Sequence, residues 1–183
     1  MVITSFDNNT IKKISRLRDK RYRDEEEAYI IEGLRAVRDS LPYLVLPKLV
    51  FSESAYARLS GEFSAEDAIV CSDAVFARLS QTENSQGVIA VAKKRTPEKL
   101  YGSDRALFLD RIRDPGNLGT IIRSALATGF TDIYLYDCVD AYNPKVVRSA
   151  VSAISRLNLF EADETDVAEL KKRGYAFVCA DMG

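Results

Sequence analysis

The segment 106–130 limits the possible folds most narrowly, because it reads as a strand, a tight turn and a helix in direct succession. Residues 106–112 form a short apolar run of the kind that is buried in a parallel sheet. Residues 114–117 (Asp-Pro-Gly-Asn) have the composition of a turn, in which the asparagine can cap the following helix. From Leu118 apolar residues recur at helical spacing until Gly129. This order places side chains where a strand ends, which is where α/β sheets bind ligands.

The same segment resembles the first signature motif of the SpoU, or TrmH-like, RNA ribose methyltransferases. The resemblance implies a fold of the SPOUT superfamily, S-adenosylmethionine as the cofactor, structured RNA as the substrate and a homodimer for the complete enzyme. Without this resemblance, Arg123 would be interpreted as an ordinary surface arginine, whose apolar stem packs on the helix while its charged end stays in water. The matching positions are Asp114, Pro115, Asn117, Leu118, Gly119, Ile121, Arg123, Ala125 and Gly129.

The resemblance also implies that Asn117 and Arg123 belong to the catalytic site. Mechanisms proposed for the family use the matching arginine as the base that deprotonates the ribose hydroxyl, aided by an RNA phosphate. The pKa of arginine lies above about 12, which favours another role, in which the guanidinium holds the phosphate or the hydroxyl and a partner accepts the proton. In that role Asn117 is expected to fix the turn and to orient Arg123.

Composition and charge are compatible with this function without requiring it. The chain has 183 residues, 46% of them hydrophobic, which is enough for one large core or two small ones. Its net charge of −1 gives no overall attraction to a polyanion, so RNA must bind to local basic patches. The sequence has neither an apolar run of transmembrane length nor a charged and then apolar leader, which predicts a cytoplasmic protein without a membrane partner.

The chain contains no histidine, which excludes several classes of chemistry. Serine and cysteine triads that need imidazole, most zinc hydrolase sites and the usual general base near neutral pH are all ruled out. Chemistry must then use carboxylates, arginine, lysine, tyrosine or a substrate that is already reactive, such as a sulfonium methyl donor. Cys71, Cys138 and Cys179 are far apart and odd in number, so we expect small buried side chains and neither a disulfide framework nor a metal site.

The first 95 residues are interpreted as a small αβ domain that binds the RNA substrate, because strands and helices alternate along it. Residues 12–23 carry seven cations against one acid, a pattern that most often marks a solvated helix face. The strand that ends at Glu32-Gly33 and the Gln86-Gly87 pair resemble the substrate-binding domain common in the same family, which favours RNA binding. The predicted RNA-binding residues here are Lys12, Lys13, Arg16, Lys20 and Arg23.

The polar segment 93–97 breaks the hydrophobic pattern, so the domain boundary is expected between residues 92 and 104, giving domains 1–95 and 104–183. From residue 106 onward strands alternate with helices, which predicts an α/β fold with a parallel, Rossmann-like sheet in the second domain. A helix predicted over 145–154 carries Arg148, which the resemblance places on the side that faces RNA. The serine and glycine that usually follow in the family are Ala150 and Ser152 here.

Residues 175–180 are predicted as a last strand, and the sequence given reaches Gly183 without a covering helix. In the family, two further motifs build the trefoil knot that holds the cofactor, and nothing here matches them. The expectation is therefore an incomplete methyltransferase domain, inactive alone, whose cofactor-binding residues are unknown. Two functions remain open: methyl transfer to a ribose 2′-hydroxyl of ribosomal RNA or transfer RNA, and a non-catalytic RNA-binding module without a cofactor site.

Overall fold

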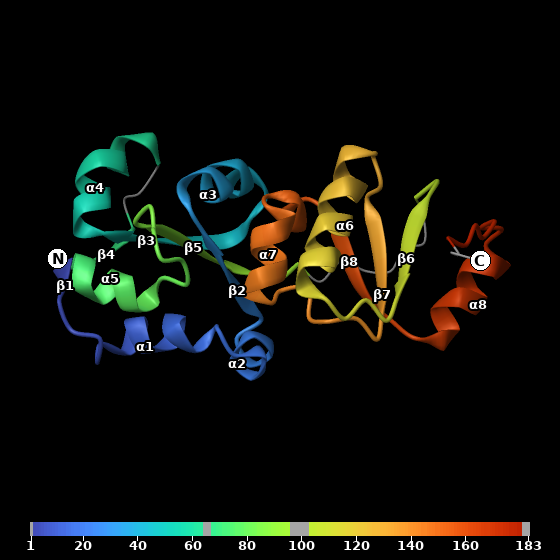
Figure 1. Ribbon diagram of the computed structural model, residues 1–183, viewed down its shortest axis with the longest axis horizontal. Coiled ribbons are helices and arrows are strands. Elements are labelled where there is room, and N and C mark those ends of the chain that lie inside the picture. The colour runs from blue at the N-terminus through green and yellow to red at the C-terminus, as the bar shows by residue number, and fades with distance from the viewer. Residues whose placement is uncertain (1, 64–66, 96–102, 181–183) are drawn as a thin grey trace.

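The computed structural model describes residues 2–63, 67–95 and 103–180. Figure 1 shows two sheets that follow one another along the long axis, each with helices packed against it. The first sheet, within the described ranges, is mixed, with the strand order β1-β4-β3-β5-β2. Its strands are β1 (Val2–Ile3), β2 (Ala28–Glu32), β3 (Val45–Ser52), β4 (Ile69–Cys71) and β5 (Val88–Lys93).

Helices cover both faces of the first sheet because its strands alternate apolar side chains between the two faces. Ile30, Val50 and Ile89 face α1 and α5, whereas Ile31 and Phe51 face α3 and α4. The helical elements of this half are α1 (Asn9–Arg16), α2 (Lys20–Glu25), α3 (Leu34–Ser40), η1 (Leu41–Tyr43), α4 (Glu53–Leu59), η2 (Ser60–Glu62) and α5 (Asp73–Leu79).

The second sheet is parallel, with the strand order β6-β7-β8 among the described residues. Leu109 and Leu135 pack on the face that α6 and α7 cover, and Tyr134 and Phe160 pack on the other face, beside α8. This confirms the predicted α/β fold with a parallel sheet. The elements are β6 (Ala106–Asp110), α6 (Pro115–Ala127), β7 (Asp132–Tyr136), α7 (Pro144–Ala150), η3 (Ala153–Ser155), β8 (Asn158–Ala162) and α8 (Glu164–Lys172).

The two halves share one hydrophobic core. A single cluster of buried side chains runs from Val37 on α3 to Val147 on α7 and Ile122 on α6. Across the boundary the ring centroids of Tyr29 and Tyr142 lie 4.8 Å apart. Burial raises the pKa of the Tyr142 hydroxyl to about 12, so the ring stays neutral in this contact. In Figure 1, α7 lies between the first sheet and α6, where it packs against both halves.

The basic segment 12–23 is divided between two helices, because Asp19 caps α2 with its carboxylate accepting from the Arg21 N–H at 2.9 Å. Two sequence predictions about local structure were wrong. The helix predicted over 145–154 ends at Ala150, because Val151 has a φ of 55°, outside the helical region. Residues 175–180 form no strand: the chain reverses after α8, and the Tyr175 hydroxyl donates to the carbonyl of Ser103. In the described ranges no helix is long and apolar enough to cross a bilayer.

Candidate functional site

The start of α6 is capped by Asp114, and the prediction that Asn117 is the cap was wrong. The Asp114 carboxylate accepts from the backbone N–H of Asn117 at 2.7 Å. Pro115 occupies the first helical position, where its lack of an N–H carries no penalty. Because a carboxylate already covers this helix end, the N-terminus of α6 offers little attraction for a further anion.

Gly119 explains one of the fixed positions of the motif, since it lies where α6 crosses α7. A Cβ atom added at Gly119 would lie 2.5 Å from Cβ of Ser149 and 2.7 Å from the carbonyl oxygen of Val146. Only hydrogen fits there, so the helix axes approach closely. This contact fixes α6, and with it Arg123, relative to α7 and the first half of the protein.

Asn117 and Arg123 are exposed on α6 and are not brought together. Six residues of helix separate them by about 9 Å along the axis and by about 120° around it. No hydrogen bond joins them in the described structure, and the expectation that Asn117 orients Arg123 stays a prediction. Arg123 itself makes no hydrogen bond or ion pair to any described residue. Its guanidinium is therefore available to a ligand.

Arg123 lines a groove of about 490 Å³ at the boundary between the two halves. One wall comes from α3 and another from the last turn of α6, and the floor is the segment that follows α7. The groove is lined by Arg35, Asp39, Arg123, Leu126, Ala127, Ala150, Val151, Ser152, Ala153 and Arg156. No sequence pattern predicted that Arg35 or Arg156 would lie near Arg123, because both come from segments without a motif.

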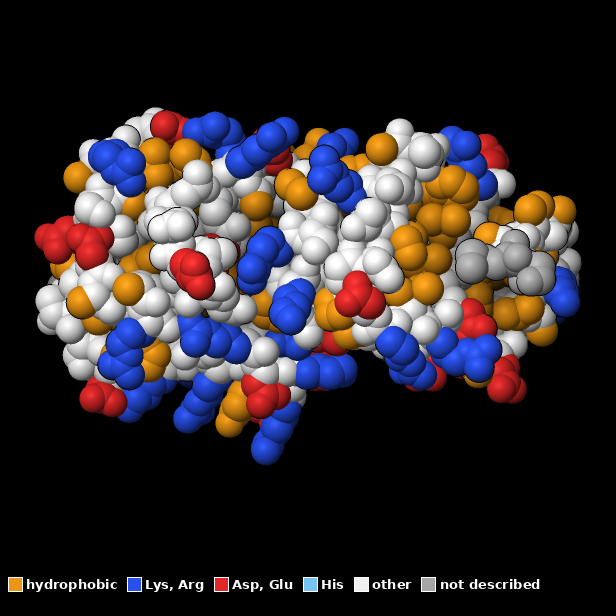
Figure 2. All heavy atoms as spheres, in the orientation of Figure 1, with side chains coloured by type: hydrophobic (Ala, Val, Ile, Leu, Met, Phe, Trp, Pro, Cys, Tyr) orange, Lys and Arg blue, Asp and Glu red, His pale blue; other side chains and the backbone are white. Residues whose placement is uncertain are grey.

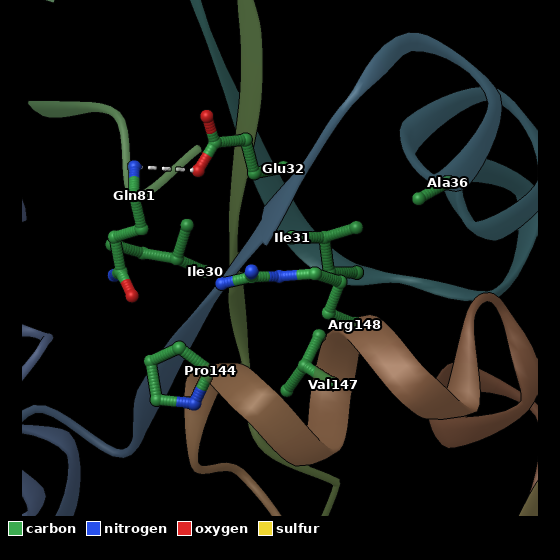
Figure 3. Close-up of a pocket in the computed structure, with 8 residues that line it drawn as sticks. All are labelled: Ile30, Ile31, Glu32, Ala36, Gln81, Pro144, Val147 and Arg148. Carbon is green, nitrogen blue, oxygen red and sulfur yellow. Dashed lines mark hydrogen bonds between the residues drawn. The ribbon is translucent and has the colours of Figure 1, made fainter. Parts of the chain in front are cut away.

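Arg148 lies beside a second, smaller hollow on the same boundary, shown in Figure 3. Its side chain extends from α7 past Ile31 of β2, toward the space below Gln81. Arg148 is exposed and makes no hydrogen bond or ion pair within the described ranges. The Arg148 guanidinium is therefore free to bind an RNA phosphate, and its RNA contact stays a prediction.

Glu32, at the end of β2, organises the loop beside this hollow. Its carboxylate accepts from the Gln81 N–H at 2.9 Å, as Figure 3 shows, and from three hydroxyl groups of the same loop. Those hydroxyls belong to Ser80, Thr82 and Ser85. The Glu-Gly pair was noted in the sequence, but this role depends on residues about fifty positions away.

The predicted RNA-binding cations of the first half fall into three environments. Lys13 and Arg16 are exposed on α1, and the Arg16 guanidinium lies 5.3 Å from the Tyr22 ring centroid. Lys12 and Lys20 form exposed ion pairs with Asp7 and Asp24, at 2.8 and 2.6 Å, which compete weakly with a ligand.

Arg23 differs from these four, because its side chain is only 3% exposed. Its guanidinium donates to the Asp140 carboxylate and to the carbonyl oxygens of Leu17 and Arg18. Its donors are used inside the protein, so the prediction that Arg23 contacts RNA phosphate does not hold in this structure.

Comparison with known proteins connects this geometry to a family. Residues 8–90 match the MRM3-like substrate binding domain, and residues 104–183 match the SpoU rRNA Methylase family. The fold superimposes on an rRNA methyltransferase from Sinorhizobium meliloti with a TM-score of 0.78 at 28% identity, covering 94% of this chain and 69% of that one. An RNA 2′-O ribose methyltransferase of known structure is 30% identical, with a TM-score of 0.70 over 94% of this chain and 70% of that one.

This chain belongs to the SpoU rRNA methylase family. The resemblance drawn from segment 106–130 is thereby confirmed. Among the relatives, the Bacillus subtilis 23S rRNA (guanosine(2553)-2′-O)-methyltransferase RlmP is 35% identical over 154 residues, which are 81% of this chain and 60% of the relative. The mitochondrial rRNA methyltransferase 3A of Danio rerio is 34% identical, over 84% of this chain and 38% of its own length. The chain thus spans 60% and 38% of the length of these two relatives.

Proposed function

We propose that this protein transfers a methyl group from S-adenosylmethionine to a ribose 2′-hydroxyl of structured RNA. Ribosomal RNA is the first candidate substrate and transfer RNA the second. The observation that carries the proposal is Arg123: it lies exposed on the motif helix α6, without a partner among the residues that the structure describes, in a groove that the two halves of the chain build together. The family's solved 2′-O ribose methyltransferase shares this fold.

The chemistry requires a group that holds the ribose in place. A ribose hydroxyl is a poor nucleophile, so the site must align its oxygen with the methyl carbon and provide for the departing proton. We assign Arg123 to positioning, because its fork of N–H donors fits a phosphate or a hydroxyl oxygen, and because arginine side chains in general keep their proton in proteins and so make poor bases. In this role the guanidinium binds the nucleotide and another group accepts the proton.

The described residues do not by themselves fit a closed site for S-adenosylmethionine. The hollow beyond β6 and β7, about 300 Å³, offers the carboxylates of Asp110 and Glu164. Asp110 already pairs with Arg111 at 2.8 Å, and Glu164 accepts from the Tyr136 hydroxyl at 3.3 Å. We therefore assign no cofactor contact to this chain, although a related rRNA methyltransferase from Sinorhizobium meliloti has been solved with AdoMet bound.

Partners follow from the surface of both halves. We propose that Lys12, Lys13, Arg16 and Lys20 on α1 and α2, together with Arg148, bind RNA phosphates. We also propose that the complete enzyme is a homodimer, supported by Phe108 and Tyr136, which stay partly exposed on the outer face of the second sheet. The cytoplasmic location stays a prediction, since the relatives include mitochondrial proteins.

The proposed activity is tested by mapping 2′-O-methylation across the ribosomal and transfer RNA of source cells with and without the full gene. We expect one or a few sites to lose methylation without the gene, to regain it with the wild-type gene and to stay unmethylated with an Arg123→Ala gene. An unchanged methylation map would favour the non-catalytic RNA-binding module.

A further inference from the structure

The groove around Arg123 has two walls from different halves of the protein. Arg35 on α3 belongs to the first half, and Arg156, directly after η3, belongs to the second. Figure 1 shows α3 and the last turn of α6 on either side of the end of α7. Because one hydrophobic core joins these elements, the two walls keep their spacing without a ligand.

The groove has an excess of positive charge. Among its described lining residues are three arginines and one acid, Asp39. The Asp39 carboxylate lies 3.5 Å from the guanidinium of Arg35. The Arg35 side chain is 89% exposed, and an exposed ion pair of this kind contributes little free energy and competes weakly with a ligand. Arg123 has no partner among the described residues. At least two guanidinium charges therefore remain unbalanced over a volume of about 490 Å³.

The guanidinium of Arg156 packs against an aromatic ring. Its guanidinium carbon lies 4.8 Å from the ring centroid of Tyr43, which is itself 44% exposed. Contact with the ring leaves the outward N–H donors of a guanidinium unused. Tyr43 therefore holds Arg156 at the groove and adds a half-exposed aromatic surface next to it.

The shape of the groove suits a nucleic-acid backbone better than a compact apolar ligand. Small side chains, Ala127, Ala150 and Ala153, line it between the arginines, so a chain can approach closely. Guanidinium forks match phosphate oxygens in pairs, and aromatic or guanidinium planes stack on unpaired bases. Figure 2 shows Lys and Arg side chains over the region of α3 and α7 on this face.

We propose that this groove binds the phosphodiester backbone of a single-stranded segment of the RNA substrate, beside the nucleotide to be methylated. Arg35 and Arg156 hold phosphates on the two sides of Arg123, and Tyr43 stacks on a neighbouring unpaired base. The inference rests on the proposed function and extends it. It assigns substrate contacts to α3, η1 and the segment after η3.

The test measures binding of the 183-residue chain to a fluorescein-labelled RNA hairpin with an unpaired loop, by fluorescence anisotropy at several KCl concentrations. The groove variant is Arg35→Gln/Arg156→Gln, and the matched control is Lys48→Gln/Arg58→Gln, which removes two exposed cations outside the groove. We expect the groove variant to flatten the slope of log K against log salt by about 1.4 to 1.8, because each lost phosphate contact removes roughly 0.7 to 0.9. The control should change it by less than about 0.5.

A second measurement addresses Tyr43. Tyr43→Phe keeps the ring and should bind the hairpin like the wild type, whereas Tyr43→Leu should lose the preference for the hairpin over a blunt duplex of the same stem. Circular dichroism melting curves check that all variants are folded.

The outcomes separate the two proposals. If the groove and control variants have equal slopes while replacement of Lys13, Arg16 and Lys20 weakens binding, the groove assignment is overturned and the proposed function stands. If the unaltered chain does not bind the hairpin at any salt concentration, both the groove assignment and the proposed RNA surface of this chain are overturned.

Discussion

Arg23 and Asp140 form an ion pair across the boundary between the two halves, with Nη2 of the arginine 2.6 Å from Oδ2 of the aspartate. The two side chains are only 3% and 10% exposed. The same guanidinium donates to the carbonyl oxygens of Leu17 and Arg18, at 2.8 and 2.6 Å. One side chain thus joins the turn between α1 and α2 to the loop that follows β7.

The first prediction concerns this pair. Arg23→Met should lower the free energy of unfolding by about 3 to 5 kcal/mol, because it leaves the Asp140 carboxylate buried without a counter-charge. The exposed pair of Arg21 with Glu25 is the matched control, and Arg21→Met should leave the free energy of unfolding nearly unchanged, because water screens an exposed pair. Urea unfolding measures both. The double variant Arg23→Met/Asp140→Leu should regain part of the stability lost in Arg23→Met. Equal losses of stability in Arg23→Met and Arg21→Met would contradict the buried role of Arg23.

The second prediction concerns the crossing of α6 and α7. Gly119→Ala should destabilise the protein by about 1 to 2 kcal/mol, because a methyl group there meets α7 and the overpacking cost exceeds the gain in helix propensity. Gly61→Ala is the control, since a Cβ at Gly61 meets no described atom within 4 Å. Urea unfolding should find Gly61→Ala near neutral. A stabilised Gly119→Ala would show that the helices separate easily.

The third prediction concerns the cysteines, which the sequence analysis expected to be buried. Cys71 is buried, whereas Cys179 is exposed, so the expectation was wrong for Cys179. Burial raises the pKa of the Cys71 thiol to about 11, so at pH 8 about one molecule in a thousand carries the thiolate. An Ellman assay at pH 8 should show rapid reaction at Cys179 and reaction at Cys71 only after unfolding in urea. Cys179→Ser should remove the rapid phase, and its persistence would place a reactive thiol elsewhere.

The fourth prediction concerns RNA binding by α1 and α2. Replacing Lys13, Arg16 and Lys20 by alanine should flatten the salt dependence of RNA affinity by roughly 2 to 3, because each cation that contacts a phosphate releases counterions. The control is Arg38→Ala, since Arg38 is engaged with Glu62 on another part of the first half. An unchanged slope in the triple variant would mean that these cations are only a solvated surface.

The fifth prediction concerns Arg123 in the complete enzyme. Arg123→Ala should lower single-turnover methyl transfer by roughly 10²-fold or more while the fold stays intact. Arg123→Lys separates the two roles: an ammonium lacks the planar fork but loses its proton more easily. Positioning predicts a loss similar to that of alanine at every pH, whereas a base predicts recovery as the pH rises. Near wild-type rates for Arg123→Ala would remove Arg123 from the mechanism.

Local pattern was enough to predict most of the elements and the motif helix. Apolar periodicity is a property of short segments, so the strand at 106, the helix after it and the parallel sheet were predicted from the sequence. The helix begins at Pro115, inside the segment 114–117 that was predicted as a turn. The last predicted strand failed because a strand needs a neighbouring strand to pair with, and the apolar residues 175–180 pair with none in the described structure.

The roles of individual charges could not be predicted in the same way. Arg23 sits in a basic run that looks uniform in the sequence, yet its partner Asp140 is 117 positions away. Whether an arginine is buried and paired or exposed and available depends on which distant segment packs against it. For the same reason, the position of Arg35 and Arg156 beside Arg123 could not be predicted from the sequence.

The hydrophobic core shared by the two halves holds α1 and the groove at a fixed distance from one another. If α1 and the groove both hold RNA, the separation between them is set by packed side chains and not by a flexible tether. A folded RNA then presents to Arg123 only the nucleotide whose distance from the α1 contact equals that separation. If the proposed function holds, the fixed distance between α1 and the groove determines which nucleotide of a folded RNA is methylated.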